Sequence, residues 1–257
     1  MPHDMTLDAF HFAYRSLEQE MKDQAEGDGC VFLPSAAPAG PVDYVLICME
    51  PSLGSTSADH VREHVEAGGR NFLSSIEDFI LHFSARNYLC GPTQRYHVTD
   101  WSKGAMRVAV ARAARDQRYT KWYPFLLEEI ELVAAPNAGF IAVGAVVAEE
   151  LQRRNFRRPL CRVIHYSGQA ARARKKGIAG REPAFEDFRD SVSLKDLLVT
   201  AEEILRSACV PTAIRDETLT KLEKRQLTTS RKQLIFNYKV AFESFRTRSG
   251  IEIEAGG

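Results

Sequence analysis

The sequence predicts an α/β protein in which a mainly parallel sheet of four strands lies between two layers of helices. Short apolar runs rich in β-branched residues alternate with segments of helical periodicity, which is the pattern of such a three-layer fold. The run Asp43–Met49 is continuously apolar after its first residue, as in a strand buried on both faces of a parallel sheet. With 257 residues, of which 44% are hydrophobic and 26% charged, the chain can bury a substantial core. We expect one α/β domain over residues 1–210 and a basic and aromatic helical extension over residues 211–257.

The first helix is expected over Leu7–Met21, where apolar residues recur at helical spacing, and the Gly/Pro/Ala/Ser-rich stretch Glu26–Pro41 predicts a surface loop. The four buried strands are expected at Asp43–Met49, Arg95–Thr99, Phe140–Gly144 and Cys161–Tyr166. Helices are expected around Phe72–Phe83 and at Ala105–Asp116, Tyr123–Ala134, Ala145–Arg153 and Pro183–Ala208, with Pro124 near the start of its helix, where proline is tolerated. A site is expected where the carboxyl ends of the strands meet.

Composition excludes several classes of protein. The five cysteines are scattered and form no C-x-x-C pair, which indicates reduced thiols and neither a zinc nor an iron–sulfur site. The first residues carry no basic and apolar leader. The most apolar window, Leu132–Leu151, contains Pro136 and two glutamates and cannot cross a bilayer as one helix. We therefore expect a cytoplasmic monomer with no membrane partner, metal or cofactor.

The net charge of zero conceals an uneven distribution. Residues 1–150 hold 12 Lys and Arg against 21 Asp and Glu, whereas residues 151–181 hold 10 Lys and Arg and no acid. A basic segment of this kind is either a solvated loop or a face directed at an anionic partner. The strand-like run Cys161–Tyr166 lies inside it and favours the second interpretation, because it fixes the charges to a scaffold.

Three residues at expected strand ends could carry chemistry. Glu50 follows the first strand and could polarise a water or stabilise a developing cation. Asp100 ends the second strand and could bind a polar ligand edge, and His165 ends the fourth and could donate to a leaving group. Each also has an ordinary interpretation: a solvent-facing acid, a helix N-cap and a strand-end histidine. Gly144 ends the third strand at the same edge.

Taken in order, these segments resemble motifs of the uracil-DNA glycosylase superfamily over about residues 40–205. Cys48–Gly54, which includes Met49-Glu50-Pro51-Ser52, is similar to its first motif, G-[MI]-N-P-G, and His165-Tyr166-Ser167 is similar to its last, H-P-S. His97-Val98-Thr99-Asp100 resembles the Y-[IV]-T-N strand of the iron–sulfur branch, and Phe140–Leu151 resembles the A-L-G-x-x-A-x-x-x-L segment. Gly69-Arg70-Asn71-Phe72 is a weaker match to the loop that carries an aromatic platform for the base.

The resemblance implies a glycosylase that flips a base out of DNA and cleaves its glycosidic bond. Glu50 would stabilise the oxocarbenium-like sugar while water attacks C1′, and His165 would donate to O2 of the base. The implied base-binding residues are Met49, Phe72 and Asp100. The implied DNA-binding residues are Ser52, Ser167, Gln169, Arg172, Arg174, Lys175 and Lys176.

The sequence also departs from the family pattern. Ser102-Lys103-Gly104 stands where the iron–sulfur branch has a cysteine, so no cluster is expected. Tyr166 replaces the proline of H-P-S. Cys48 and Ser52 replace two glycines, and their side chains leave less room for the backbone to approach a phosphate. These departures leave open a catalytically inactive DNA-binding module. A third alternative is an unrelated nucleotide-binding protein with a phosphate loop at 52–57, although the P-loop pattern is missing there.

Asp100 stands where the family has the asparagine that binds uracil. A carboxylate only accepts hydrogen bonds, so it opposes O4 of uracil but accepts from the N4 amino group of cytosine, with a shared proton serving N3. We therefore expect a cytosine-type target, with uracil as the alternative. Because excision of ordinary cytosine would damage the host, the hypothesis extends to cytosine modified at C5, as in hypermodified phage DNA, and to a role in defence. The small residues of 52–58 are consistent with a roomier pocket.

Overall fold

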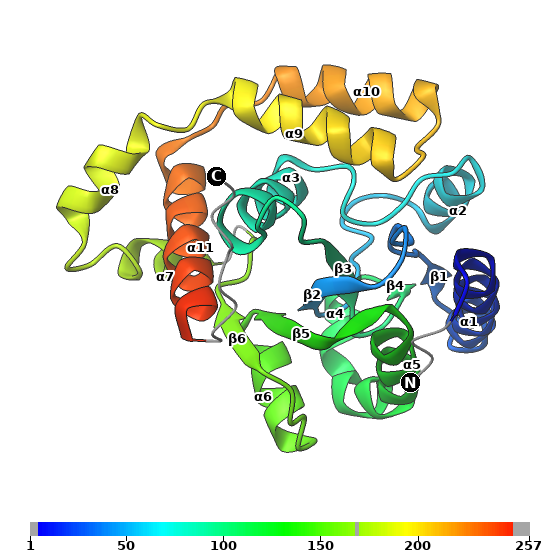
Figure 1. The fold of residues 1–257 in the computed structure, drawn as a ribbon. Coiled ribbons are helices and arrows are strands. Elements are labelled where there is room, and N and C mark those ends of the chain that lie inside the picture. Colours follow the sequence, from blue (N-terminus) through cyan, green and yellow to red (C-terminus); the bar gives the residue numbers. More distant parts are fainter. Residues whose placement is uncertain (1–4, 168–169, 249–257) are drawn as a thin grey trace.

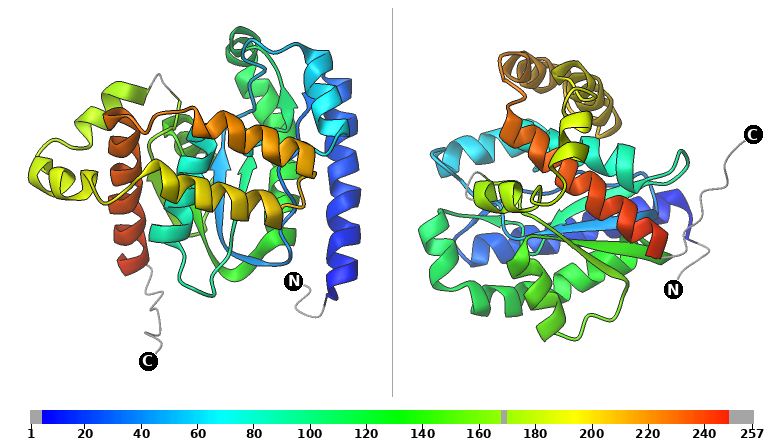
Figure 2. Two further views of the ribbon diagram at one scale, coloured as in Figure 1. Left: turned by 90° about the horizontal axis from the view of Figure 1, so that it is seen from above. Right: turned by 90° about the vertical axis from the view of Figure 1, so that its left-hand side faces the viewer.

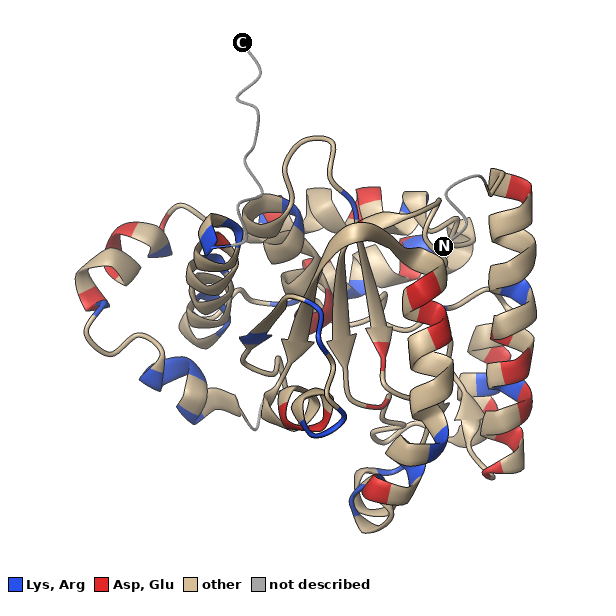
Figure 3. Ribbon diagram, turned by 60° about the horizontal axis from the view of Figure 1, so that its bottom comes forward, with Lys and Arg blue, Asp and Glu red and all other residues tan. Residues whose placement is uncertain are grey.

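The computed structural model describes residues 5–167 and 170–248 and confirms the α/β architecture (Figure 1). Four parallel strands, β2 (Val42–Cys48), β3 (Tyr96–Asp100), β5 (Ala134–Val143) and β6 (Leu160–Val163), form one sheet in the order β3-β2-β5-β6. All four strands point to the same side of the sheet (Figure 3). Their carboxyl ends form one edge, here called the rim, and Cys48 pairs with Asp100 there.

Helices cover both faces of the sheet. On one face α1 (Leu7–Gly27), α5 (Arg115–Val133) and α6 (Ala145–Arg153) pack against alternate strand residues such as Val45 and Phe140. On the other face α3 (Ile76–Ser84), its π-helical continuation η1 (Ala85–Leu89), α8 (Glu182–Arg189) and α9 (Leu194–Ser207) pack against residues such as Leu46 and Ile141. The continuous apolar run Tyr44–Cys48 of β2 follows from this two-sided burial.

Smaller elements complete the described chain. They are β1 (Val31–Phe32), which pairs with β4 (Gly104–Ala105), and α2 (Ala58–Glu66), α4 (Val108–Ala113), α7 (Ala171–Lys176) and α10 (Thr212–Glu223). Helices α9 and α10 contact one another and run side by side across the molecule (Figure 2).

The C-terminal segment is built into the core. Helix α11 (Thr229–Arg248) contacts α3, η1 and β6, and its buried residues belong to the same apolar cluster as the strands. Aromatic side chains such as Tyr238 and Phe242 are fully buried in this contact. Residues 211–257 were expected to form an extension outside the α/β domain, but α11 packs within the helical layer on one face of the sheet.

Several expected boundaries were wrong. The helix expected at 183–208 is two helices, because Ser193 caps α9 through a capping box with Asp196. The helices expected at 105–116 and 123–134 are α4 and one long α5. Pro124 therefore lies inside α5, which continues through it because Tyr119 and Trp122, in the turn before the proline, are fully buried. The expected loop at 26–41 holds the end of α1 and β1, and β6 stops at Val163.

Within the described ranges, no helix combines the length and the apolar character that a membrane span requires.

Candidate functional site

The three residues singled out at strand ends lie at the rim. Glu50 stands two residues beyond β2, Asp100 is the last residue of β3, and His165 stands two residues beyond β6. The charge of Glu50 contributes to the pKa of both Asp100 and His165, raising each. The sheet therefore brings a carboxylate, a second acid and an imidazole within electrostatic reach of one another.

Glu50 is held by three side chains of α5. Arg115 donates to Oε1 through Nε at 3.2 Å and Nη2 at 2.7 Å, and Tyr119 donates its hydroxyl to Oε2 at 2.5 Å. Arg118 Nη2 lies 3.5 Å from Oε1, and the Glu50 side chain is only 5% exposed. Burial and the Glu50 carboxylate raise the pKa of Tyr119, which therefore remains a donor. These partners were not identified from the sequence, although their i, i+3, i+4 spacing places them on one helix face.

Asp100 is a buried acid next to an amide. Its residue is 3% exposed, and Asn71 donates Nδ2–H to Asp100 Oδ2 at 2.5 Å. Burial raises the pKa of Asp100 to about 8, although the charge of Lys103 opposes this shift. At neutral pH the side chain is therefore mainly a carboxylic acid, which can both donate and accept a hydrogen bond, and not the ionised carboxylate that was expected from the sequence.

His165 is a neutral imidazole in a defined orientation. The Ser167 backbone N–H donates to His165 Nδ1 at 3.0 Å, and burial lowers the pKa of His165 to about 4 despite the nearby Glu50 charge. With Nδ1 accepting, the proton is on Nε2, which remains a donor. Gly144, which follows β5, lies next to His165: a Cβ there would make ordinary contact with His165 Cδ2 at 3.4 Å, whereas the φ of +107° favours glycine.

Tyr166, at the position of the family's proline, fills part of the site. Its ring stacks on His165 with a centroid distance of 4.7 Å. The phenol lies within electrostatic reach of Cys48 and Asp100, and burial raises the pKa of Tyr166 well above its ordinary value. His165 and Tyr166 thus form one stacked unit after β6, with the phenol of Tyr166 directed toward Cys48 and Asp100.

The expected base platform is buried. Phe72 is 2% exposed, and its carbonyl lies 3.2 Å from His82 Nε2. Its φ of +63° is unusual for a residue that is not glycine, and such strain, about 1–3 kcal/mol, is often found at functional sites. Met49 packs with the cluster on the opposite face of the sheet, so Met49 and Phe72 do not belong to the same apolar cluster.

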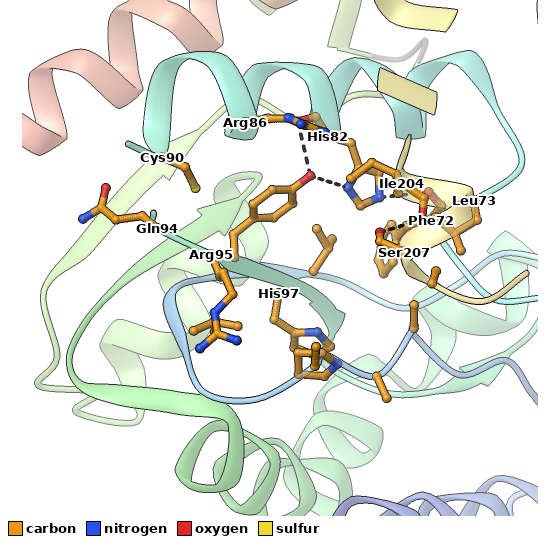
Figure 4. A pocket seen from close by; sticks show the side chains of 18 of the residues that line it. Phe72, Leu73, His82, Arg86, Cys90, Gln94, Arg95, His97, Ile204 and Ser207 are labelled. Carbon is orange, nitrogen blue, oxygen red and sulfur yellow. Dashed lines mark hydrogen bonds between the residues drawn. The ribbon is translucent and has the colours of Figure 1, made fainter. Parts of the chain in front are cut away.

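A cavity of about 640 Å³ lies next to the segment that contains Phe72 (Figure 4). Asn71 and Phe72 line it, together with His82 and Tyr96, whose Nδ1 and hydroxyl are 2.9 Å apart. A second cavity of about 720 Å³ lies between α1 and α2 and is lined by charged side chains. Glu50, Asp100 and His165 line neither of these two cavities, and Asp100 is buried.

A buried polar network supports β3 from below the rim. Glu129 accepts from Thr99 at 2.7 Å, lies 2.9 Å from Lys103 Nζ and lies 3.0 Å from His97 Nε2. The Lys103 and Glu129 side chains are each 1% exposed. Although burial acts in the opposite direction, Lys103 and His97 lower the pKa of Glu129 to about 2. The network fixes the backbone that ends in Asp100, because Lys103 Nζ also lies 3.4 Å from the Asp100 carbonyl.

The expected DNA-binding residues divide into three groups. Ser52, Arg172, Lys175 and Lys176 are exposed, and Ser167 is half-buried. Arg174 is 4% exposed and donates to the carbonyls of Tyr166 and Ser167, so it anchors the turn after His165 and is not available to a phosphate. Gln169 lies outside the described residues.

Comparisons with family models, curated proteins and solved structures found no match. Among the described residues, no three His, Cys, Asp or Glu side chains form a group that could hold a metal ion. The five cysteines are free thiols.

Proposed function

We propose that this protein is a DNA glycosylase that extrudes a pyrimidine nucleotide and hydrolyses the bond between its base and deoxyribose. The observation that carries the proposal is the pair formed at the rim by His165, a neutral imidazole with its proton on Nε2, and Glu50, a carboxylate held by arginines. Cleavage of a glycosidic bond develops positive charge on the sugar and negative charge on the base. A carboxylate and a neutral donor are suited to these two charges.

In the proposed reaction the bond from C1′ to N1 breaks, and its electron pair leaves with the base. His165 donates a hydrogen bond from Nε2–H to O2, where the negative charge collects. Glu50 stabilises the cationic sugar and accepts a proton from the water that adds to C1′. The base anion then takes a proton from solvent. Arg115 and Tyr119 keep the carboxylate of Glu50 in one orientation, which reduces reorganisation during the reaction.

Asp100 is proposed to bind the Watson–Crick edge of a cytosine-type base. As a carboxylic acid, it can donate to N3 and accept from the N4 amino group. The same acid can donate to O4 and accept from N3–H of uracil, so its raised pKa makes uracil the second candidate. We favour cytosine because its N3 lone pair is a stronger proton acceptor than a carbonyl oxygen and shares the proton more tightly.

Binding of a base to Asp100 requires this buried side chain to become accessible. The segment Asn71–Phe72 is the movable wall in this proposal, since it contacts Asp100 on one side and the cavity of Figure 4 on the other. The strained φ of Phe72 would be relieved by such a rearrangement. The loop around Ser52 is exposed and built of small residues, which supports extending the proposal to cytosines modified at C5, including those of phage DNA, and to a role in defence.

The test is base release from matched DNA duplexes that carry uracil, cytosine or a C5-modified cytosine, scored as alkali-labile abasic sites. Glu50→Gln is expected to abolish release while DNA binding persists. Glu149→Gln, the same change at an exposed residue of α6, serves as the control.

Release of uracil alone would overturn the cytosine assignment. Salt-dependent DNA binding without any abasic product would overturn the enzymatic proposal in favour of a binding module. Unchanged release by Glu50→Gln would remove the proposed role of Glu50.

A further inference from the structure

The cavity of about 640 Å³ borders the outer side of β3, an edge strand of the sheet. Tyr96, His97 and Val98 all line it. Because successive side chains of a strand point to opposite faces of the sheet, a cavity that meets all three residues lies beside the strand and not on one face. Its other walls come from residues 36–39, from η1 and the turn after it, and from the end of α9 (Figure 4). Sites for small molecules have volumes of this size, about 300–1,000 Å³.

The outer side of β3 carries backbone groups without partners. The Arg95 carbonyl, just before β3, accepts from Tyr44 N–H at 3.2 Å and therefore faces β2. Alternate residues of a strand direct their backbone groups to opposite sides, so the N–H and carbonyl of Tyr96 and Val98 face away from β2. No described residue forms a hydrogen bond with these groups. Val98 is only 6% exposed, and buried backbone groups are nearly always hydrogen-bonded, so a partner is expected in the cavity.

Several polar side chains of the cavity wall already have partners. His82 Nδ1 lies 2.9 Å from the Tyr96 hydroxyl, and its Nε2 lies 3.2 Å from the Phe72 carbonyl. Arg86 is paired with Glu203 of α9. Most of the remaining wall is apolar, and no aspartate or glutamate lines the cavity. An occupant would therefore meet apolar surface on most sides and the unpaired backbone of β3 on one side.

We propose that this cavity binds a small, uncharged heterocycle whose ring edge carries a hydrogen-bond donor next to an acceptor. The donor bonds to the Tyr96 carbonyl and the acceptor to the Val98 N–H, which lie on the same side of the strand. The apolar walls cover the ring, and the lack of an acid in the lining disfavours a cation. An added peptide strand fits less well, because only these two residues of the strand offer free backbone groups to the cavity.

Occupation of the cavity also controls the rim. Asn71 and Phe72 line the cavity, and Asn71 donates to Asp100 Oδ2 at 2.5 Å. A ligand packed against this segment holds it in place, so that Asp100 stays buried and base release slows. The excised pyrimidine carries the required ring edge, which makes the cavity a site for inhibition by the product. This consequence rests on the proposed function, whereas the binding site itself does not.

Binding is tested with free cytosine and free uracil as probes, and with 1,3-dimethyluracil, which has no N–H donor, as the matched control. The amide signals of the ¹⁵N-labelled protein report the contact. The Val98 amide is expected to shift saturably with cytosine or uracil, and the Thr99 amide, which faces β2, is expected to shift much less. Dimethyluracil is expected to bind about 10- to 100-fold more weakly, because the Tyr96 carbonyl would stay unpaired. Equal binding of dimethyluracil, or no saturable shift at Val98, would overturn the inference.

A second test fills the cavity. Ala208, the half-buried C-cap of α9, lines it, and Ala208→Leu is expected to weaken cytosine binding about tenfold. Ala67→Leu is the control, because Ala67 is the exposed C-cap of α2 and has a similar backbone conformation, with φ −72° and ψ 1° against φ −79° and ψ 5°. Thermal unfolding confirms that both variants are folded. Cytosine binding by Ala208→Leu that matches binding by Ala67→Leu would contradict the placement of the ligand.

Control of the rim is tested by measuring base release at increasing concentrations of free cytosine. Release is expected to fall with the midpoint of the binding curve, and Ala208→Leu is expected to require about tenfold more cytosine. Inhibition that is unchanged in Ala208→Leu would show that cytosine acts at Asp100 itself and would overturn the control. Cytosine binding at Val98 by a protein that releases no base would support the cavity site and contradict the glycosylase proposal. Base release without cytosine binding would overturn the inference alone.

Discussion

Replacing Asp100 with asparagine removes a buried acid whose protonation is coupled to folding. Burial raises the pKa of Asp100 from 3.8 to about 8 in the folded chain, so between these values the folded protein binds a proton that the unfolded chain does not. The free energy of unfolding therefore falls as pH rises through this window. An asparagine carries no charge at any pH, and its amide oxygen can still accept from Asn71. We expect Asp100→Asn to stabilise the protein.

The size of the effect follows from the two pKa values. At pH 7 the unfolded acid is ionised and the folded acid is mainly protonated, a difference of about 3 pH units, or on the order of 4 kcal/mol. For a chain of this length, that corresponds to a rise in Tm on the order of 10 °C. Below pH 4 both states are protonated, and the advantage of the variant disappears.

The assay is thermal unfolding of the two proteins between pH 4 and 9, with Asp116→Asn, a substitution at an exposed acid of α5, as the control. The difference in Tm between Asp100→Asn and the unaltered protein should increase with pH and level off above pH 8. A difference that is independent of pH, or a variant that is less stable at pH 7, would refute the account of Asp100 as a buried acid.

Three further predictions concern other described residues. His165→Ala should slow base release about 10²–10³-fold; because burial lowers the pKa of His165 to about 4, the rate of the unaltered protein should show no inflection near pH 6.5. Arg174→Ala should lower the free energy of unfolding in urea by about 1–3 kcal/mol, whereas Lys175→Ala should change it by less than about 0.5 kcal/mol and instead weaken the salt dependence of DNA binding. Glu129→Gln should destabilise the protein by about 3–5 kcal/mol, because Lys103 would lose its buried counter-charge, and denaturant melts that match those of the unaltered protein would contradict this.

Most of the fold could be predicted from local patterns. The four strands were found from short runs rich in apolar and β-branched residues, of which only that of β2 was described as continuous, and α6 has the predicted bounds because Gly144 precedes it and its apolar residues recur at helical spacing. The break before α9 was missed although Ser193 and Asp196 form a capping box, which is visible in the sequence. The continuation of α5 through Pro124 could not be predicted, because it depends on tertiary burial of the turn before the proline.

The strand ends identified the rim residues but not their surroundings. Arg115 is 65 positions from Glu50, and Asn71 is 29 positions from Asp100, so neither contact has a local signature. The protonation of Asp100 follows from burial by distant segments. The same reason accounts for Arg174, whose charge suggested an exposed phosphate contact but whose packing under α11 buries it.

The network around Glu129 also determines how the edge strand β3 can pair. His97 and Thr99 are two residues apart and therefore point to the same face, where Glu129 meets both. If β3 slipped by one residue along β2, these side chains would turn to the apolar face, and Glu129 and Lys103 would remain as buried ions with fewer partners. The polar cluster thus penalises an alignment that is shifted by one residue. Since Asp100 ends the same strand, the alignment that satisfies Glu129 is also the one that delivers Asp100 to the rim.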